Sequence, residues 1–328
     1  MLKKIGVIAF WILLALLVIA LIITLVIYFY PKKVASLQSA NPEKRNYAQS
    51  MAAIKTAIDN DKRQSDLNSD CLPIVKSHDE KTTKAVVLLH GISACPDQFN
   101  QLGDVFFKAG YNVYIPRVPH HGFNDNTRHA DISLDDIGAF LEDTASIASG
   151  LGDEVGVVGL SGGANMATWL TQRTDVFSRA LLLSPFYEPA TRHAPKWQAP
   201  FMMTLYGRNI LPNDFNGELS VRAVAKYVIL RNNYDPHYQA PALKHLAVVT
   251  SELDDDIDLT LAHTIPRTLK NANDDVTYQE TRLTKDFGVT HDIVHSNAPG
   301  MKQNKKQLYK LYFDMYENKQ PKEQKPTS

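Results

Sequence analysis

The chain has 328 residues but no net charge, little cysteine and no internal repeat. Its 35 basic and 35 acidic residues cancel, so no overall electrostatic field favours a nucleic acid partner. No cysteine lies near the start to carry a lipid, and Cys71 and Cys95 are the two that the sequence holds. His120 and His121 are adjacent, but no spaced His or Glu completes a ligand set, so we expect neither a metal nor a cofactor.

One stretch, residues 5–30, has no charged side chain at all. As a helix it would span about 39 Å, which exceeds the roughly 30 Å of a bilayer's hydrocarbon core. A secretory signal has a shorter apolar region and a small-residue cleavage site. Residues 28–31 are a poor cleavage site, and their aromatic side chains suit a membrane interface. We therefore interpret residues 1–30 as an uncleaved, single-pass transmembrane anchor.

The orientation of this anchor depends on two opposing observations. Basic residues flank both ends of the apolar run: Lys3 and Lys4 before it, then Lys32, Lys33, Lys44 and Arg45. The positive-inside rule thus slightly favours a cytoplasmic body. An isolated pair of cysteines at two loop positions instead suggests one disulfide, Cys71–Cys95, in an oxidising compartment. We therefore expect an extracytoplasmic body.

The most informative motif is the pentapeptide G-x-S-x-G at residues 159–163. Residues 154–158 before it are typical of a buried strand, and residues 164–170 after it are typical of a helix. A serine on a sharp strand-to-helix turn holds its hydroxyl above the sheet, and the glycines permit strained dihedrals and close packing. Ser161 is therefore predicted to be a nucleophile.

A second motif precedes this one along the chain. The apolar run 85–89 ends in His90 and Gly91. A strand that runs into His-Gly is typical of the loop that supplies one main-chain N–H of an oxyanion hole. The other N–H comes from the residue after the nucleophile. The two donors are thus predicted to be Ile92 and Gly162.

These motifs resemble the α/β-hydrolase superfamily, in its serine-esterase and monoglyceride-lipase-like (lysophospholipase-like) branch. The resemblance covers residues 70–317, with matches at residues 86–99, 110–122 and 157–163, and looser ones at 246–258 and 288–295. It implies the α/β-hydrolase fold, a mainly parallel sheet with helices on both faces and a cap insertion. Strand-like runs that alternate with helical ones agree with this expectation.

The superfamily order, Ser then acid then His, directs the search for the acid to the segment after a late strand, residues 246–250. In the resembling family the acid lies a few residues past this strand, and that register selects Asp254. Asp255 and Asp256 remain alternatives, because a shift of one residue changes the choice.

The base is expected in the loop after the last strand, residues 276–280, which is rich in β-branched and aromatic side chains. His291 lies in that loop and resembles the family's motif, with His295 as the rival. His263 lies in a helix-like segment between the acid and the last strand, and we interpret it as structural.

Four parts are expected along the chain: an anchor at 1–30, a polar stalk with a short helix at 31–70, an α/β-hydrolase domain at 71–317 and a disordered tail at 318–328. The alternation of strands and helices stops between residues 186 and 244, where relatives of this fold carry a cap. Its aromatic and methionine side chains could line an acyl pocket: Trp197, Phe201, Met202, Met203, Tyr206, Tyr227 and Tyr234.

The leading hypothesis is a membrane-anchored serine hydrolase that cleaves carboxylic esters, including lipid-like acyl esters. Ser161 would attack the acyl carbon, His291 would carry its proton, and Asp254 would orient the imidazole. The fold also supports amidases, peptidases and thioesterases. A catalytically silent binding module on a membrane stalk is the alternative from another class.

Overall fold

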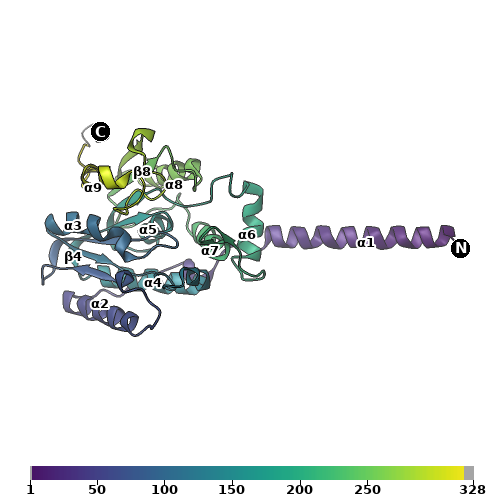
Figure 1. The fold of residues 1–328 in the computed structure, drawn as a ribbon, viewed down its shortest axis with the longest axis horizontal. Helices are drawn as coiled ribbons and strands as arrows, with labels where there is room; N and C mark the ends of the chain where they lie inside the picture. The colour runs from purple at the N-terminus through teal and green to yellow at the C-terminus, as the bar shows by residue number, and fades with distance from the viewer. Residues whose placement is uncertain (1, 321–328) are drawn as a thin grey trace.

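The structure, a computed structural model, describes residues 2–320 and contains a seven-stranded sheet with helices around it (Figure 1). The strand order is β1-β3-β2-β4-β5-β8-β9, and every neighbouring pair is parallel except β1 with β3. The strands are β1 Ile74–Lys76, β2 Thr82–Leu89, β3 Tyr111–Ile115, β4 Gly152–Leu160, β5 Phe177–Leu183, β8 His245–Ser251 and β9 Thr277–Leu283. The expected tail at 318–328 lies outside the described residues from 321 onward.

Helices cover both faces of the sheet, as the predicted fold class requires. α3 and α9 pack on one face in a cluster around Phe106 and Tyr312, while α4, α5 and α8 pack on the other around Trp169. The helices are α1 Leu2–Phe29, α2 Tyr47–Lys62, α3 Asn100–Lys108, α4 Leu134–Ala148, α5 Gly162–Arg173, α6 Ala199–Leu205, α7 Val221–Arg231, α8 Leu259–Asn271 and α9 Met301–Tyr316. The mainly parallel α/β fold is therefore confirmed.

The central strands read as continuous apolar runs because both of their faces are covered by helices. β8 is buried along its whole length, and β4 is buried from Val155 to Leu160. Local signals set the helix ends. The Ser133 side chain accepts a hydrogen bond from the main chain of Asp136, and the Asp136 carboxylate accepts one from the main chain of Ser133. This capping box starts α4 at Leu134, the residue after the cap Ser133.

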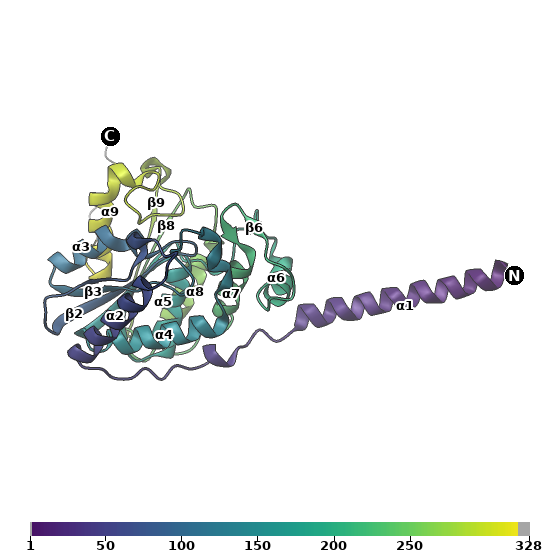
Figure 2. The same cartoon turned by 60° about the horizontal axis from the view of Figure 1, so that its bottom comes forward.

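α1 projects from the body as one long helix (Figure 2). Residues Lys4–Phe29 have a mean hydropathy of 3.2, and none of this span is buried against the rest of the chain. By length and composition it can cross a membrane, and a signal sequence would pass the same test.

The segment between α1 and the sheet, expected to be a stalk, lies against the body in this structure. Leu37 is fully buried, and its carbonyl accepts a hydrogen bond from the Trp169 indole (2.9 Å). Main-chain N–H groups of residues 41, 43 and 45 donate to side chains at the end of α4. The polar composition of this stretch reflects hydrogen bonding along a helix, and its apolar contacts with the body are few: buried Leu37, with partly buried Val34 and Ala40.

The chain between β5 and β8 makes an insertion at one end of the sheet. It contains α6, a short hairpin of β6 Phe215–Asn216 and β7 Leu219–Ser220, and α7. α7 packs on α5, and α6 packs on α7 beside the end of α1 (Figures 1 and 2). The insertion thus lies next to the helix that follows Ser161.

Candidate active site

Ser161 occupies the turn between β4 and α5, with φ at +58°. Such a dihedral is costly for a residue other than glycine, and it turns the side chain out of the sheet. The surrounding glycines make the turn possible. A Cβ on Gly163 would lie 2.0 Å from the carbonyl oxygen of Leu89, and one on Gly159 would lie 2.3 Å from the main chain of Gly163. The G-x-S-x-G spacing therefore reflects close main-chain packing.

The structure brings Ser161, His291 and Asp254 together from the ends of three different strands. The Ser161 hydroxyl donates to His291 Nε2 (2.8 Å), and His291 Nδ1–H donates to Asp254 Oδ2 (2.9 Å). Asp254 follows β8 and is 3% exposed, while His291 lies in the loop after β9. Ser161 itself is 6% exposed. This is the arrangement that nucleophilic catalysis by serine requires.

The alternative histidines lie elsewhere. His295 Nε2 is 3.6 Å from a carboxylate oxygen of Asp97. His263 is on α8, and its Nδ1 contacts Glu280 on β9. Neither ring makes a hydrogen bond to Ser161 within residues 2–320.

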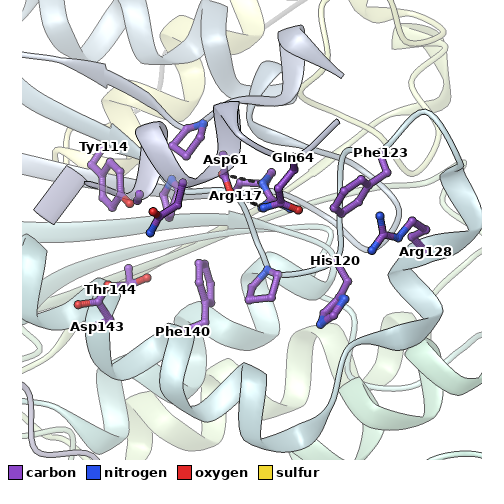
Figure 3. Close-up of a pocket in the computed structure, with 15 residues that line it drawn as sticks. Asp61, Gln64, Tyr114, Arg117, His120, Phe123, Arg128, Phe140, Asp143 and Thr144 are labelled. Carbon is purple, nitrogen blue, oxygen red and sulfur yellow. Dashed lines mark hydrogen bonds and ion pairs between the residues drawn. The ribbon is translucent and has the colours of Figure 1, made fainter. Parts of the chain in front are cut away.

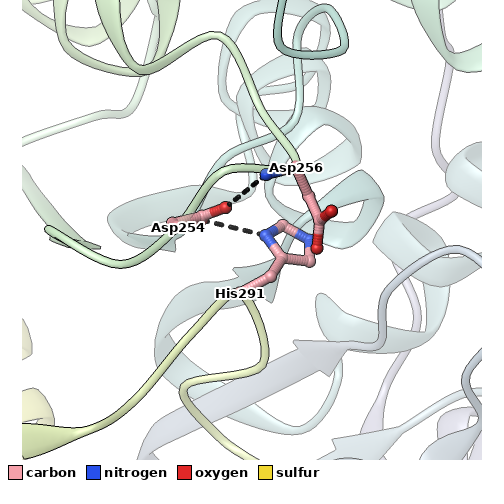
Figure 4. Close-up of side chains that lie close together, drawn as sticks. All are labelled: Asp254, Asp256 and His291. Carbon is pink, nitrogen blue, oxygen red and sulfur yellow. Dashed lines mark hydrogen bonds and ion pairs between the residues drawn. The ribbon is translucent and has the colours of Figure 1, made fainter. Parts of the chain in front are cut away.

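The alternative acids flank Asp254 but do not hold the imidazole. Asp255 is exposed and pairs with Arg192 (2.5 Å). The Asp256 main-chain N–H donates to the second Asp254 oxygen, Oδ1 (3.2 Å), and the Asp256 carboxylate lies beside the His291 ring (Figure 4). Asp254 thus accepts one hydrogen bond on each oxygen, and both bonds fix its orientation.

Two influences on the pKa of His291 oppose each other. Burial of the ring lowers it, whereas the hydrogen bond and charge of Asp254, together with two further carboxylates, raise it. The net shift is upward from 6.5. Those further carboxylates belong to Asp256 and Asp292.

The pH dependence of the reaction should report this shift. His291 must be neutral to accept a proton, so kcat/KM for an uncharged ester should rise with pH through a midpoint above 6.5. Asp256→Asn removes one charge that raises this pKa, so the midpoint should move to lower pH. Asp255→Asn removes an adjacent charge that is exposed and paired with Arg192, so it should leave the midpoint in place. A pH–rate series on the three proteins checks this, and identical profiles would contradict it.

The predicted oxyanion loop lies directly against the serine turn. A Cβ on Gly91 would lie 3.4 Å from Ser161 Cβ, and one on Gly162 would lie 2.6 Å from Ile92 Cγ1. Neither Ile92 nor Gly162 donates a main-chain hydrogen bond to another described residue. Both N–H groups therefore stay available beside the serine hydroxyl.

The His90 side chain fixes the position of this loop. Its Nε2 accepts a hydrogen bond from the Val118 main chain (3.0 Å), so its Nδ1–H donates to the Gly91 carbonyl (2.9 Å). Complete burial lowers the pKa of His90 to about 4, which keeps the ring neutral in this tautomer. Because the peptide unit is planar and trans, a fixed Gly91 carbonyl also fixes the direction of the Ile92 N–H.

Gln98 is a site residue that the sequence motifs did not reveal. Its Oε1 accepts a hydrogen bond from the Gly91 main chain (2.9 Å), and its Nε2 donates to Asp292 (2.8 Å). Gln98 thus joins the oxyanion loop to the segment that carries His291. A lone glutamine beside an apolar helix carries no recognisable pattern, so only the three-dimensional structure identifies it.

The structure contains the predicted disulfide between Cys71 and Cys95, with the Cα atoms 5.2 Å apart. Cys95 immediately precedes the short 3₁₀ helix Pro96–Phe99, which carries Gln98. The bond closes a separation of 24 residues, and such a loop contributes about 3 kcal/mol to stability in the chain-entropy model. The disulfide therefore fastens the helix that in turn holds Gly91.

Reduction should consequently lower activity before the protein unfolds. We expect a several-fold fall in kcat when the disulfide is reduced, because the oxyanion loop loses a support while the core remains intact. The measurement is ester turnover and far-UV circular dichroism at increasing reductant concentration. A Cys71→Ser, Cys95→Ser double variant should start at the reduced level and be insensitive to reductant. Activity that falls only with the fold would contradict this role.

Asp254, Asp256 and His291 also form a group whose ligand atoms lie within 4.8 Å of one another (Figure 4). Two carboxylates and an imidazole are ligands that a divalent cation accepts. However, both nitrogens of His291 already form hydrogen bonds, to Asp254 and Ser161. A cation at this position would have to displace the bond to Asp254.

A cavity of about 350 Å³ lies away from this site, between α2, α4 and the segment after β3 (Figure 3). None of Ser161, Asp254 and His291 lines it. Arg117 enters it and forms a two-pronged ion pair with Asp61 on α2, with Nε–Oδ2 at 2.8 Å. Since these charges satisfy each other, we interpret the pair as the link between α2 and the sheet.

Comparisons with known proteins agree with this architecture. The sequence profile of the alpha/beta hydrolase family matches residues 86–289. A solved structure from work on LipS and LipT, two metagenome-derived lipolytic enzymes, has a TM-score of 0.53 at 16% identity and covers 77% of this chain and 99% of its own. No curated protein sequence matches the chain.

Two further solved structures have the same fold. A soluble variant of monoglyceride lipase from Saccharomyces cerevisiae, in complex with a substrate analog, has a TM-score of 0.52 at 12% identity and covers 75% of this chain and 92% of its own. Est1E from Butyrivibrio proteoclasticus with bound ferulic acid has a TM-score of 0.51 at 10% identity and covers 74% and 94%. At such identities the likeness concerns the fold.

Proposed function

Because the chain belongs to the alpha/beta hydrolase family, we propose that it is a serine hydrolase that cleaves carboxylic esters through an acyl-enzyme intermediate. The observation that carries the proposal is the continuous chain of hydrogen bonds from Ser161 through His291 to buried Asp254. Ester hydrolysis is also the chemistry named for similar structures, which include lipolytic enzymes and a monoglyceride lipase.

The reaction follows from this geometry in two halves. His291 Nε2 takes the hydroxyl proton as Ser161 Oγ attacks the acyl carbon, and Asp254 stabilises the resulting imidazolium. His291 then gives the proton to the departing alcohol, which leaves the acyl group on Ser161. In the second half His291 deprotonates a water that attacks the acyl-enzyme, and the proton returns to Ser161 as the acid is released.

The main-chain N–H groups of Ile92 and Gly162 would stabilise the charge on the carbonyl oxygen in both halves. Each such donor contributes about 2.7–4 kcal/mol to the stability of the transition state. His90, Gln98 and the disulfide hold this loop, so the donors need little reorganisation during the reaction.

The same proposal assigns roles to the rest of the chain. Residues 1–30 would anchor the protein in a membrane, residues 71–317 would form the hydrolase domain, and residues 186–244 would form a cap over the active site. The disulfide supports an extracytoplasmic location for the body. Lipid-like acyl esters are then the natural substrate class, because they concentrate in the membrane that holds the anchor.

A fluorophosphonate probe tests the proposal directly, because it labels only an activated serine. We expect the full-length protein in detergent micelles to be labelled at Ser161 and to hydrolyse p-nitrophenyl esters, with a rate that depends on acyl chain length. Corresponding anilides and thioesters would measure the preference for esters over amides and thioesters. Absence of labelling and of turnover would favour a silent binding module instead.

A further inference from the structure

The last turn of α1 is attached to α6 of the insertion. The Thr204 hydroxyl donates to the Ile27 carbonyl (2.9 Å), and Lys32 Nζ donates to Thr204 Oγ1 (2.8 Å). Farther along, Arg208 donates to the Pro31 carbonyl (3.2 Å). α6 lies across the end of α1 (Figure 1). A membrane that surrounds α1 would therefore have α6 lying along its surface.

Exposed apolar side chains are concentrated in the stretch of chain that contains α6. Outside α1 and Tyr30, the described part of the chain has six exposed large hydrophobic residues, and four of them lie between residues 197 and 215: Trp197, Ile210, Leu211 and Phe215. Trp197 is 64% exposed and Ile210 is 60% exposed. Single exposed apolar residues are ordinary, but a cluster marks an interaction surface.

The chemistry of this cluster matches one occupant, the interfacial layer of a lipid bilayer. The Phe201 ring lies between those of Tyr28 (5.8 Å) and Trp197 (6.2 Å), which continues the aromatic end of α1 onto α6. Lys32 and Arg208 lie at the same level. Aromatic rings with basic side chains are typical of the boundary between headgroups and acyl chains.

We propose that residues 197–215 lie in the interfacial layer of the membrane that α1 spans, and that the active site takes its acyl ester from that layer. The inference rests on the anchor and the hydrolase activity proposed above. α6 packs on α7, and α7 packs on α5, the helix that follows Ser161. The proposed surface is thus separated from the helix that follows Ser161 by a single helix, α7.

Tryptophan quenching in vesicles tests the position of this surface. The full-length protein is reconstituted in phosphatidylcholine with or without bromine on the upper acyl chain, and the emission of Trp197→Phe is subtracted from that of the wild type. Trp11 in α1 and fully buried Trp169 are common to both proteins and cancel. We expect the difference emission, which belongs to Trp197, to fall at least twofold in brominated lipid.

The same data separate this inference from the anchor. If Trp11 emission is quenched but the difference emission is not, the anchor stands and the interfacial surface is refuted. If Trp11 is not quenched and alkaline carbonate releases the protein, the anchor fails and the interfacial surface fails with it.

A substitution in the surface tests the route of the substrate. Ile210→Asp should lower the hydrolysis of a long-chain ester dissolved in vesicles several-fold, while the hydrolysis of a water-soluble acetate ester stays unchanged. Tyr238→Asp is the matched control, because Tyr238 is 65% exposed and lies beside Asn273 at the end of α8, away from the α1–α6 junction. Equal rates for Ile210→Asp and wild type on both substrates would overturn the proposed route.

An independent observation concerns Tyr227 on α7. Its ring is fully buried, and ring carbons Cε1 and Cδ1 lie 2.7 and 2.9 Å from where a Cβ on Gly162 would be. Asn165 fixes this position, since its Nδ2 donates to the Tyr227 carbonyl (2.9 Å) and its Oδ1 accepts from the Tyr234 hydroxyl (3.0 Å). Cε1 adjoins the carbon that bears the hydroxyl, so the hydroxyl lies close to the predicted oxyanion donor.

The Tyr227 hydroxyl has no hydrogen-bond partner among the described residues. Four other buried tyrosine hydroxyls are paired: Tyr187 with Thr168, Tyr234 with Asn165, Tyr309 with the Val294 carbonyl and Tyr312 with the Ile293 carbonyl. Burial raises the pKa of Tyr227, so its hydroxyl remains a donor at neutral pH. An unpaired buried donor is destabilising, and a ligand held beside Gly162 would supply the missing partner.

We infer that the Tyr227 hydroxyl donates to the carbonyl oxygen of the bound ester, as a third donor beside the N–H groups of Ile92 and Gly162. This inference also rests on the proposed hydrolase activity. The donor is carried by the insertion, so the insertion would complete the oxyanion hole only when α7 is seated on α5.

Tyr227→Phe tests this role, because it removes the hydroxyl and keeps the ring. We expect kcat to fall about tenfold or more and KM to stay unchanged. The melting temperature should stay unchanged or rise. Tyr187→Phe is the control, since it breaks the 2.8 Å bond to Thr168 and should lower the melting temperature without changing kcat. Wild-type kcat in Tyr227→Phe would refute the inference, whereas absence of turnover in the wild type itself would refute the hydrolase.

Discussion

Ser161→Ala is expected to abolish ester turnover while it leaves the fold intact. The substitution removes the only hydrogen-bond partner that His291 Nε2 has among residues 2–320, and with it the nucleophile, so no acyl-enzyme can form. Loss of a triad nucleophile typically costs about 10⁶-fold in kcat, or about 8 kcal/mol of transition-state stabilisation. Turnover of a p-nitrophenyl ester and labelling by a fluorophosphonate are the two measurements.

The control for this variant is its stability. Ser161 has a positive φ, and alanine tolerates that conformation about as poorly as serine, so the melting temperature should change little. Ser93→Ala is a matched variant, because Ser93 also has a positive φ and lies on the predicted oxyanion loop, while the hydrogen bonds of His291 go to Asp254 and Ser161. Wild-type turnover in purified Ser161→Ala would refute the proposed nucleophile.

Most of the fold could be predicted because its strongest signals are local. Buried parallel strands appear as short apolar runs, and the predicted strands at 85–89, 154–158 and 246–250 lie within β2, β4 and β8. The turn at Ser161 requires glycine on both sides for steric reasons, so the sequence carries it as a motif. A local main-chain geometry that only a few residue types permit can be predicted from the sequence alone.

The parts that depended on distant contacts could not be read in this way. Residues 31–46 are polar in sequence, yet they lie along α4 because their main chain finds hydrogen-bond acceptors there. Gln98 joins Gly91 to Asp292, a residue 194 positions away. The hydrogen bond between Gln98 and Asp292 forms only because two loops lie side by side in the folded chain. Neither loop has a sequence pattern that predicts it.

The candidate acid, Asp254, could be predicted only in part from the sequence. Three consecutive aspartates follow β8. They lie in a loop, which has no regular spacing of buried and exposed residues, so the sequence pattern does not show which of the three points inward. In the structure the turn after Ser251 directs Asp254 inward, where it is 3% exposed, and leaves Asp255 exposed to pair with Arg192. The resemblance to a family, not the local sequence, supplied the register that selected Asp254.

Asp254→Asn is expected to lower kcat about 10⁴-fold, or by about 5 kcal/mol of transition-state stabilisation. Asp254 uses both oxygens, since Oδ1 accepts from the Asp256 main chain and Oδ2 accepts from His291 Nδ1–H. Asparagine has one oxygen, so satisfying the Asp256 N–H turns its NH₂ group towards His291. That group favours the tautomer with the proton on Nε2, which cannot accept the proton of Ser161.

Asp256→Asn is the matched control, because it removes the same charge two residues away. Its side chain makes no hydrogen bond to His291 within the described residues, and its main-chain N–H to Asp254 remains. At a pH well above the midpoint of the activity profile, where the charge effect on His291 no longer matters, we expect kcat within a few-fold of wild type. Turnover of one uncharged ester by both variants under those conditions is the measurement. If Asp256→Asn lost as much kcat as Asp254→Asn, or more, the residue that orients His291 would be Asp256 and not Asp254.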